Sequence, residues 1–233
     1  MAGFHTHVAT STALGVAYGT AGYLYFDMPA TTSTLAAVLC GMGGMIPDLD
    51  GDTGVPVREA EAAIAAVVPV LLLQCFQTWG LERESIVLAV IGTYLLIRFG
   101  VGGLFTRLTR HRGMWHSIPA ALNVALITFL ITSYQELDAR IFKSVAVFLG
   151  FLSHLILDEL WSIDWKAARY KESHGTALKL FTLHRPSANL LAYGLLGILV
   201  FSGFQSWRED VAHHAPTTGL TPVTGAGSDG VAK

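Results

Sequence analysis

The chain has 233 residues, of which 52% are hydrophobic and only 14% are charged, and its mean hydropathy is +0.50. This composition excludes an ordinary soluble domain and indicates an integral membrane protein. The formal net charge of −2 argues against a nucleic acid as the main partner, so the lipid bilayer is the expected surrounding.

Several apolar segments approach the ~20 residues that a helix needs to cross the hydrocarbon core of a bilayer. The sequence therefore predicts an all-α fold, a polytopic transmembrane helical bundle with roughly seven spans. Gly- and Ala-rich stretches, such as GMGGM at 41–45, allow neighbouring membrane helices to approach closely. The predicted spans are residues 8–26, 31–47, 62–79, 86–105, 117–134, 141–158 and 188–206.

Residues 1–206 are expected to form a single transmembrane domain. The polar and aromatic segment at about 160–187 is expected at the membrane surface, either as an amphipathic helix over the site or as a solvated connection. The stretch 207–233 is rich in Gly, Thr and Pro, and we expect a disordered tail there. Cys40 and Cys75 fall inside apolar segments, which favours buried thiols over a disulfide or a metal pair.

When the seven segments are threaded alternately through the membrane, the conspicuous His and Asp side chains all fall at one end of the bundle, called side A here. The first span leaves side A after His5 and His7, and the second returns to it at PDLDGD, residues 47–52. The fourth span returns to side A before HRGMWHS at 111–117, and the sixth returns with SHLILDE at 153–159 in its last turns. The sequence thus predicts that groups far apart in the chain meet at side A.

Most of these motifs have a simpler interpretation when taken alone. PDLDGD can be only a turn, a lone His at the interface is usually structural, and HRGMWHS can be a basic flank followed by an aromatic anchor, Trp115. SHLILDE is harder to explain in this way. A helix stacks His154 and Asp158 on one face, at a depth where ionisable groups are costly unless they are paired or bound to a cation. Imidazoles and carboxylates without nearby thiolate pairs are typical of hydrolytic zinc, manganese or iron centres.

In these residues the chain resembles the membrane-bound, metal-dependent hydrolases of the YdjM type, a family also described as a domain of unknown function. The similarity covers about residues 5–165 and consists of four motifs in order: THVATSTALG with His7, PDLD at 47–50, HRGMWHS at 111–117, and GFLSHLILDEL at 150–160. It implies a helical bundle that gathers these His and Asp side chains around metal, with a hydrolase activity whose substrate is not defined. A more distant similarity connects the pattern with zinc-dependent phospholipase C enzymes.

Carried over residue by residue, the resemblance implies seven metal ligands: His7, Asp48, Asp50, His111, His116, His154 and Asp158. Because a tetrahedral zinc ion accepts only about four ligands, the expected cofactor is one or two divalent ions, with zinc as the first choice and manganese or iron as alternatives. Two ions bridged by an Asp would suit a phosphoester substrate, and zinc lowers the pKa of a water ligand to about 7.

Further candidates for supporting the ligands or for binding substrate are Asp52, Arg112, Ser117 and Ser153. The planar guanidinium of Arg112 suits a phosphate or carboxylate, although it is equally well explained as a flanking charge. Two positions depart from the family pattern. Trp115 replaces the usual Thr before the second His of HRGMWHS, and Gly51-Asp52 follows PDLD in place of a common His.

Lys and Arg residues outside the spans are more numerous on side A than on the opposite end, side B. Side A has nine: Arg58, Arg107, Arg110, Arg112, Lys166, Arg169, Lys171, Lys179 and Arg185. Side B has five: Arg83, Arg140, Lys143, Arg208 and Lys233. The positive-inside rule therefore predicts that side A, with the metal cluster, faces the cytoplasm. The expected location is the bacterial inner (plasma) membrane.

Three functions are compatible with this pattern. The favoured one is a metal-dependent hydrolase that acts on a phosphoester or on a small-molecule or lipid-like substrate. A divalent-metal transporter is disfavoured, because an ion pathway needs polar groups along the full depth of the membrane, whereas the side B halves of the spans are mostly Ala, Leu, Val and Ile. The third is a metal-binding structural protein without activity.

Overall fold

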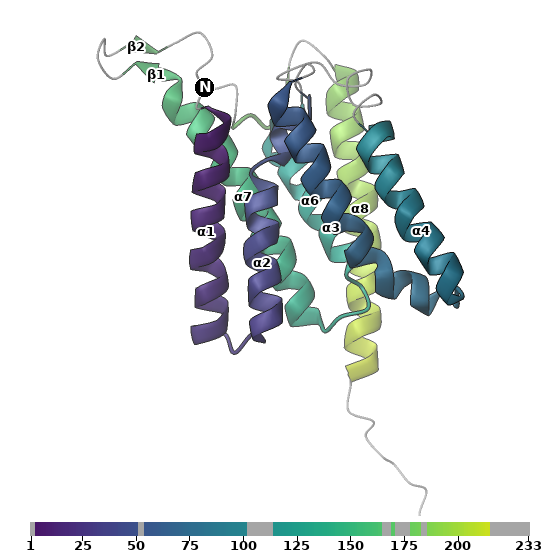
Figure 1. Cartoon of the computed structure of the whole chain (residues 1–233). Coiled ribbons are helices and arrows are strands. Elements are labelled where there is room, and N and C mark those ends of the chain that lie inside the picture. The colour runs from purple at the N-terminus through teal and green to yellow at the C-terminus, as the bar shows by residue number, and fades with distance from the viewer. Residues whose placement is uncertain are drawn as a thin grey trace, which may run out of the picture.

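In the computed structural model, helices run side by side with alternating direction (Figure 1). The structure describes residues 3–50, 54–101, 114–164, 169–170, 178–182 and 186–214. The α-helices within these ranges are α1 (Phe4–Tyr25), α2 (Ala30–Gly43), α3 (Val55–Thr78), α4 (Arg83–Leu95), α6 (Ile118–Ile131), α7 (Leu137–Trp161) and α8 (Pro186–His214). They are accompanied by a 3-10 helix, η1 (Ile46–Asp50), a π-helix, η2 (Leu96–Val101), and two short antiparallel strands, β1 (Ile163–Asp164) and β2 (Arg169–Tyr170).

Each predicted apolar segment overlaps one of these helices, which confirms the all-helical fold class. Within the described residues, three helices are long and apolar enough to cross a membrane: α3, α7, and α8 over Pro186–Ala212. The apolar helices α2 and α6 have 14 residues each. At ~1.5 Å per residue each rises only ~21 Å, less than the ~30 Å of a bilayer core. The number of crossings, seven, therefore stays a prediction.

The central helix of the bundle is α7. It packs against α1, α2 and α6, and its side chains Val147, Phe151 and Leu155 are buried in the main hydrophobic core. The same core takes Leu39 from α2 and Leu49 from η1, together with residues of α3 and α6. Because α7 is surrounded in this way, polar groups on its buried face must find partners on the neighbouring helices.

Small residues let α2 pack so closely against α7 and α1 that the backbones of neighbouring helices are in contact. A Cβ at Gly150 of α7 would collide with the carbonyl oxygen of Cys40, and one at Gly43 of α2 would collide with the backbone of Val147. Gly15 of α1 lies equally close to the backbone of Ala37. These contacts explain why GMGGM precedes η1 and confirm the close approach that the sequence predicts.

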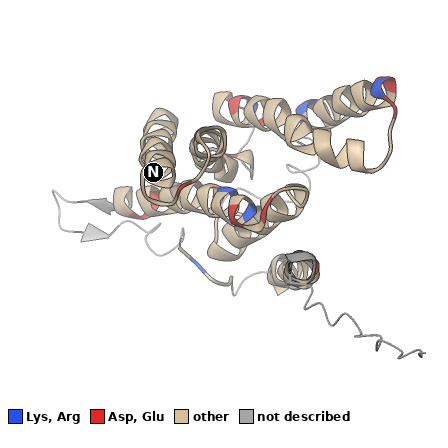
Figure 2. Cartoon of the chain, turned by 90° about the horizontal axis from the view of Figure 1, so that it is seen from below, with Lys and Arg blue, Asp and Glu red and all other residues tan. Residues whose placement is uncertain are grey.

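The periphery of the bundle is apolar. α4 packs on α3 and has no buried residue, and α8 packs on α6 with most of its apolar side chains exposed. Figure 2 shows that charged residues occupy few positions along the helices. Arg98 is a charged residue inside the fourth predicted span. It lies in η2 and forms an ion pair with the buried Glu61 of α3 at 3.4 Å. Exposed apolar flanks of this kind suit a lipid surrounding.

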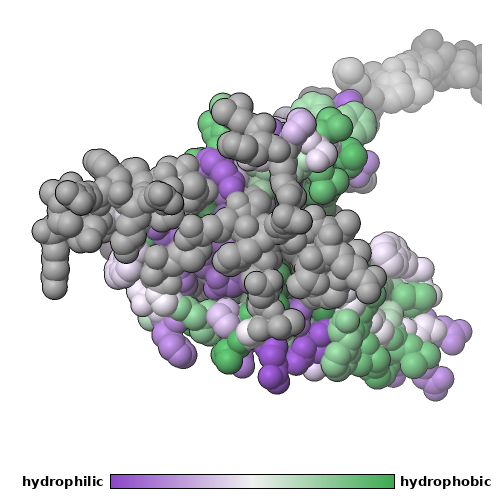
Figure 3. Space-filling model, turned by 90° about the horizontal axis from the view of Figure 1, so that it is seen from above, coloured by the Kyte–Doolittle hydropathy of each residue, from purple (hydrophilic) through white to green (hydrophobic). Residues whose placement is uncertain are grey.

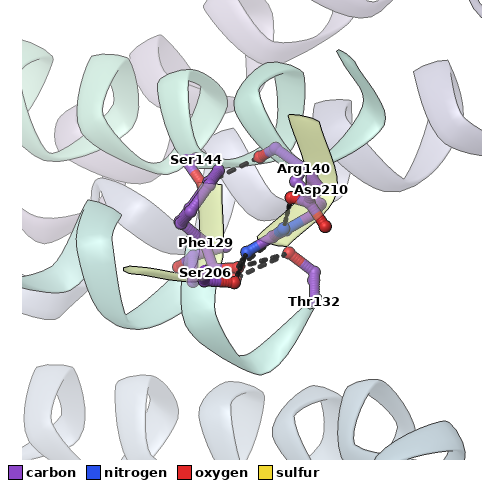
Figure 4. A network of polar contacts seen from close by, with 7 residues as sticks. Phe129, Thr132, Arg140, Ser144, Ser206 and Asp210 are labelled. Atoms are coloured by element: carbon purple, nitrogen blue, oxygen red, sulfur yellow. Dashed lines mark hydrogen bonds and ion pairs between the residues drawn. The ribbon is translucent and has the colours of Figure 1, made fainter. Parts of the chain in front are cut away.

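At side B a network of polar contacts ties α6, α7 and α8 together (Figure 4). The fully buried guanidinium of Arg140 donates to the carbonyl oxygen of Phe129 and, at 2.7 Å, to the hydroxyl of Ser206. It forms an ion pair with Asp210 and lies 3.9 Å from the centre of the Phe129 ring. Ser144 donates to the carbonyl oxygen of Arg140 at 2.8 Å. The sequence places Arg140 outside the predicted spans, whereas in the structure it is buried and connects α6, α7 and α8.

One predicted boundary is corrected. α8 continues to His214, so residues 207–214 are helical, because Asp210 is held by Arg140; residues 215–233 lie outside the described residues. In the segment at about 160–187, α7 extends to Trp161 and is followed by the hairpin of β1 and β2. Because residues 165–168, 171–177 and 183–185 lie outside the described residues, the amphipathic helix and the solvated connection both stay predictions. Cys40 and Cys75 are free thiols.

We expect Arg140→Met to lower the free energy of unfolding by about 3 kcal/mol, because it leaves a carboxylate and a backbone carbonyl without their buried cationic partner. The measurement is SDS-induced unfolding in mixed micelles, followed by circular dichroism. Arg208→Met, at an exposed Arg of α8, is the matched control and should change the free energy by less than about 0.5 kcal/mol. Equal losses in the two variants would contradict a stabilising role of the network.

Candidate metal centre

Side chains from four segments meet at side A, where α1 begins and α7 ends. The structure brings together five of the seven predicted ligands: His7 of α1, Asp48 of η1, His116 of the turn before α6, and His154 and Asp158 of α7. They form two groups of three, His7–His154–Asp158 and Asp48–His116–His154, and the ligand atoms within each group lie within 4.8 Å of one another. His154 belongs to both groups and is the centre of the cluster.

The protonation of His154 follows from its partner. Its Nδ1 lies 2.7 Å from the backbone carbonyl oxygen of Gly44, which can only accept a hydrogen bond. Nδ1 therefore carries the proton, and Nε2 of the neutral ring keeps a free electron pair. Nε2 lies 3.8 Å from Oδ1 of Asp48 and 3.7 Å from Oδ2 of Asp158. A nitrogen electron pair and two carboxylates thus face one another, an arrangement that a cation stabilises.

The other two imidazoles surround His154. The ring of His7 stacks on it at 3.7 Å with an interplanar angle of 13°, and His7 Nε2 lies 3.3 Å from Oδ1 of Asp158. The ring of His116 meets it edge-on at 5.7 Å and 65°. All four of these side chains are buried, with His154 only 1% exposed, and Nδ1 of His7 has no hydrogen-bond partner within the described residues.

This donor set fits a divalent transition metal. Imidazole nitrogens and carboxylate oxygens are ligands that zinc, manganese and iron accept, and the hydrogen bond from His154 to Gly44 is the outer contact that commonly orients a metal-binding His. Burying these polar groups away from water is unfavourable unless partners compensate for the lost hydration. A bound cation would provide that compensation.

Trp115 has a role that the sequence does not reveal. Its Nε1 donates to the carbonyl oxygen of Ile46 at 3.0 Å, and its ring meets Phe151 edge-on at 6.3 Å. The residue therefore connects the turn that carries His116 with η1, which carries Asp48. Its position in place of the usual family Thr is the only signal in the sequence. Gly44 is the second residue that sequence reasoning misses, since a backbone carbonyl has no signature in the sequence.

Ser117 and Ser153 lie beside the cluster but bond within their own turns. The hydroxyl of Ser117 accepts from the backbone N–H of Ala120 and donates to the carbonyl oxygen of Met114, so that it caps α6. Ser153 donates to the carbonyl oxygen of Gly150 at 2.7 Å. Their hydroxyls thus support the helix ends that carry the ligands.

Four predicted site residues cannot be placed around the cluster. His111, Asp52 and Arg112 lie outside the described residues, and for Asp50 only the backbone, in η1, is described. His5, which the sequence favours as structural, is exposed and belongs to neither group of ligands.

The end face that carries the cluster combines polar and apolar surface. In the view from the side A end (Figure 3), hydrophilic and hydrophobic side chains are both visible along the edge of the molecule. Asp158 lies within one turn of the end of α7, and His7 lies in the first turn of α1. The cluster is therefore close to the helix ends, at the level where the headgroup region of a bilayer is expected.

A family model described as YdjM inner membrane protein matches residues 1–178. The chain belongs to this family. The match includes all five residues of the cluster, and it confirms the resemblance that the four motifs indicate. No curated protein and no solved structure matches the chain significantly. Together with the three helices that are long and apolar enough to span a bilayer, the family identifies an integral inner membrane protein.

We expect Trp115→Phe to lower the free energy of unfolding by about 1–3 kcal/mol, because it keeps the ring but leaves the Ile46 carbonyl oxygen without its donor. The same SDS titration measures the change. Trp79→Phe is the control. It removes the same indole N–H from a Trp that follows α3 and is 71% exposed, where water can replace the lost group. Equal stability of the Trp115 variant and the wild type would show that the bond to Ile46 contributes nothing.

Proposed function

We propose that this YdjM family member is a membrane-embedded, metal-dependent hydrolase that acts on a phosphoester or lipid-like substrate at side A. One observation carries the proposal: the free electron pair of His154 Nε2 faces the carboxylates of Asp48 and Asp158 inside a buried cluster. The residues that would hold the metal are His7, Asp48, His116, His154 and Asp158.

A divalent cation in this cluster would polarise a substrate oxygen and lower the pKa of a water molecule that it holds. The protein's own contributions are orientation and exclusion of water. Gly44 fixes the tautomer and the ring plane of His154, and Trp115 holds η1 beside the turn of His116. Four of the five side chains are buried and Asp48 is 22% exposed, so the access of bulk water is limited. The place of the cluster near the helix ends suits a substrate in the headgroup region.

The charges at side B favour a hydrolase over a cation transporter. Arg140 and Lys143 are both buried near the start of α7, at the end opposite to the metal centre. Asp210 compensates the charge of Arg140, whereas the ammonium of Lys143 contacts the neutral amide oxygen of Gln135. A buried positive charge at this place disfavours the passage of a divalent cation along α7.

The proposal predicts stoichiometric divalent metal in protein purified in detergent through a tag without His residues. Elemental analysis should find at least about tenfold less metal in His154→Ala, because the substitution removes the ligand common to both groups. His5→Ala is the matched control, since it removes an exposed His from the same end of the bundle, and it should keep the wild-type metal content. Size-exclusion profiles establish that each variant is folded. Metal-free wild-type protein would contradict the proposal.

The excess of Lys and Arg on side A leads us to propose that the metal centre faces the cytoplasm. α8 ends at side B, opposite to the start of α1 (Figure 1), so an alkaline phosphatase fused after Lys233 should be active in the periplasm. A green fluorescent protein at the same position should be dark. The reverse result would refute either this orientation or the odd number of crossings.

A further inference from the structure

The ring planes of the three imidazoles of the cluster are oriented differently. The rings of His116 and His154 are inclined by 65°, so electron pairs on them can converge on one point. The rings of His7 and His154 are nearly parallel, at 13° and 3.7 Å, and the Nε2 atoms of both face the same carboxylate. Electron pairs in two stacked rings run side by side, so they do not converge on one ion.

Asp158 presents a separate oxygen to each of the stacked rings. Its Oδ1 lies 3.3 Å from Nε2 of His7, and its Oδ2 lies 3.7 Å from Nε2 of His154. The carboxylate is almost completely buried, with only 4% of the side chain exposed, so neither oxygen is turned toward bulk water. This is the arrangement of a carboxylate that serves two neighbouring positive centres.

His154 can serve only one ion. Its Nδ1 is occupied by the hydrogen bond to Gly44, which leaves Nε2 as the single nitrogen with an electron pair. Two ions therefore cannot occupy the two groups of three as complete sets, because both sets need His154. Sharing between ions must take place through a residue with two donor atoms, and the two oxygens of Asp158 face different histidines.

We propose that Asp158 bridges two divalent cations, one beside His154, His116 and Asp48 and the other beside His7. This inference rests on the proposed function and deepens it. A pair of cations a few ångströms apart is the arrangement that stabilises both the attacking and the leaving oxygen of an in-line displacement, which favours a phosphoester among the proposed substrates.

The test loads the full-length protein, in detergent and without a His tag, with Mn²⁺ and removes weakly held ions by desalting. We expect about two Mn²⁺ per chain by elemental analysis, and a low-temperature electron paramagnetic resonance spectrum in which exchange coupling replaces the six-line signal of isolated Mn²⁺. One Mn²⁺ per chain, or two with an uncoupled spectrum, overturns the bridge but leaves a metal-dependent hydrolase. Protein that retains neither Mn²⁺ nor another divalent metal removes the proposed function itself.

Two variants locate the bridge. Asp158→Asn should abolish the exchange coupling, whereas Asp138→Asn, at an exposed carboxylate at the other end of α7, should keep both ions and the coupled spectrum. His7→Ala should reduce the content from about two ions to about one and restore the six-line signal, and it serves as the decisive variant if Asp158→Asn does not fold. Retention of coupling in folded Asp158→Asn, or of both ions in His7→Ala, overturns the assignment.

Discussion

The constraint on which the centre depends is the backbone contact between α2 and α7. Gly43 and Gly150 allow the two helices to approach until a Cβ would no longer fit, and the chain leaving α2 then lies against the buried face of α7. In this position the carbonyl oxygen of Gly44 reaches Nδ1 of His154 at 2.7 Å. Helix packing thus decides which nitrogen of the central imidazole carries a proton, and hence which one faces the carboxylates.

The central helix carries opposite chemistry at its two ends. Near its start, Arg140 and Lys143 are buried cations, and Arg140 is satisfied by α6 and α8. Near its end, His154 and Asp158 face groups from α1 and η1. Polar contacts therefore position both ends of α7, and its middle packs in the apolar core. Support of this kind suits a site whose donor atoms must keep their spacing.

The sequence was sufficient for the helices and for the meeting of His7, Asp48, His116, His154 and Asp158, because apolar length and alternate threading decide which end each group reaches. The sequence was insufficient for features that depend on contacts between individual atoms. The tautomer of His154 depends on a backbone carbonyl, and the role of Trp115 depends on the distance to Ile46. The extra turns of α8 depend on a partner for Asp210 that lies 70 residues away in the chain. None of these leaves a periodic pattern in the residues themselves.

Protons are the alternative to metal as compensation for buried carboxylates, but Nε2 of neutral His154 has none to share. A proton shared between nitrogen and oxygen holds them at about 2.7–3.2 Å, whereas the three nitrogen–oxygen separations here are 3.3, 3.7 and 3.8 Å. Two donors bound to one zinc ion at ~2.1 Å, with a tetrahedral angle between them, lie ~3.4 Å apart. The spacing of the side chains is therefore compatible with the metal ion that we propose. The hydrogen bond from His154 to Gly44, at 2.7 Å, shows that the same ring adopts normal hydrogen-bond length where a proton is shared.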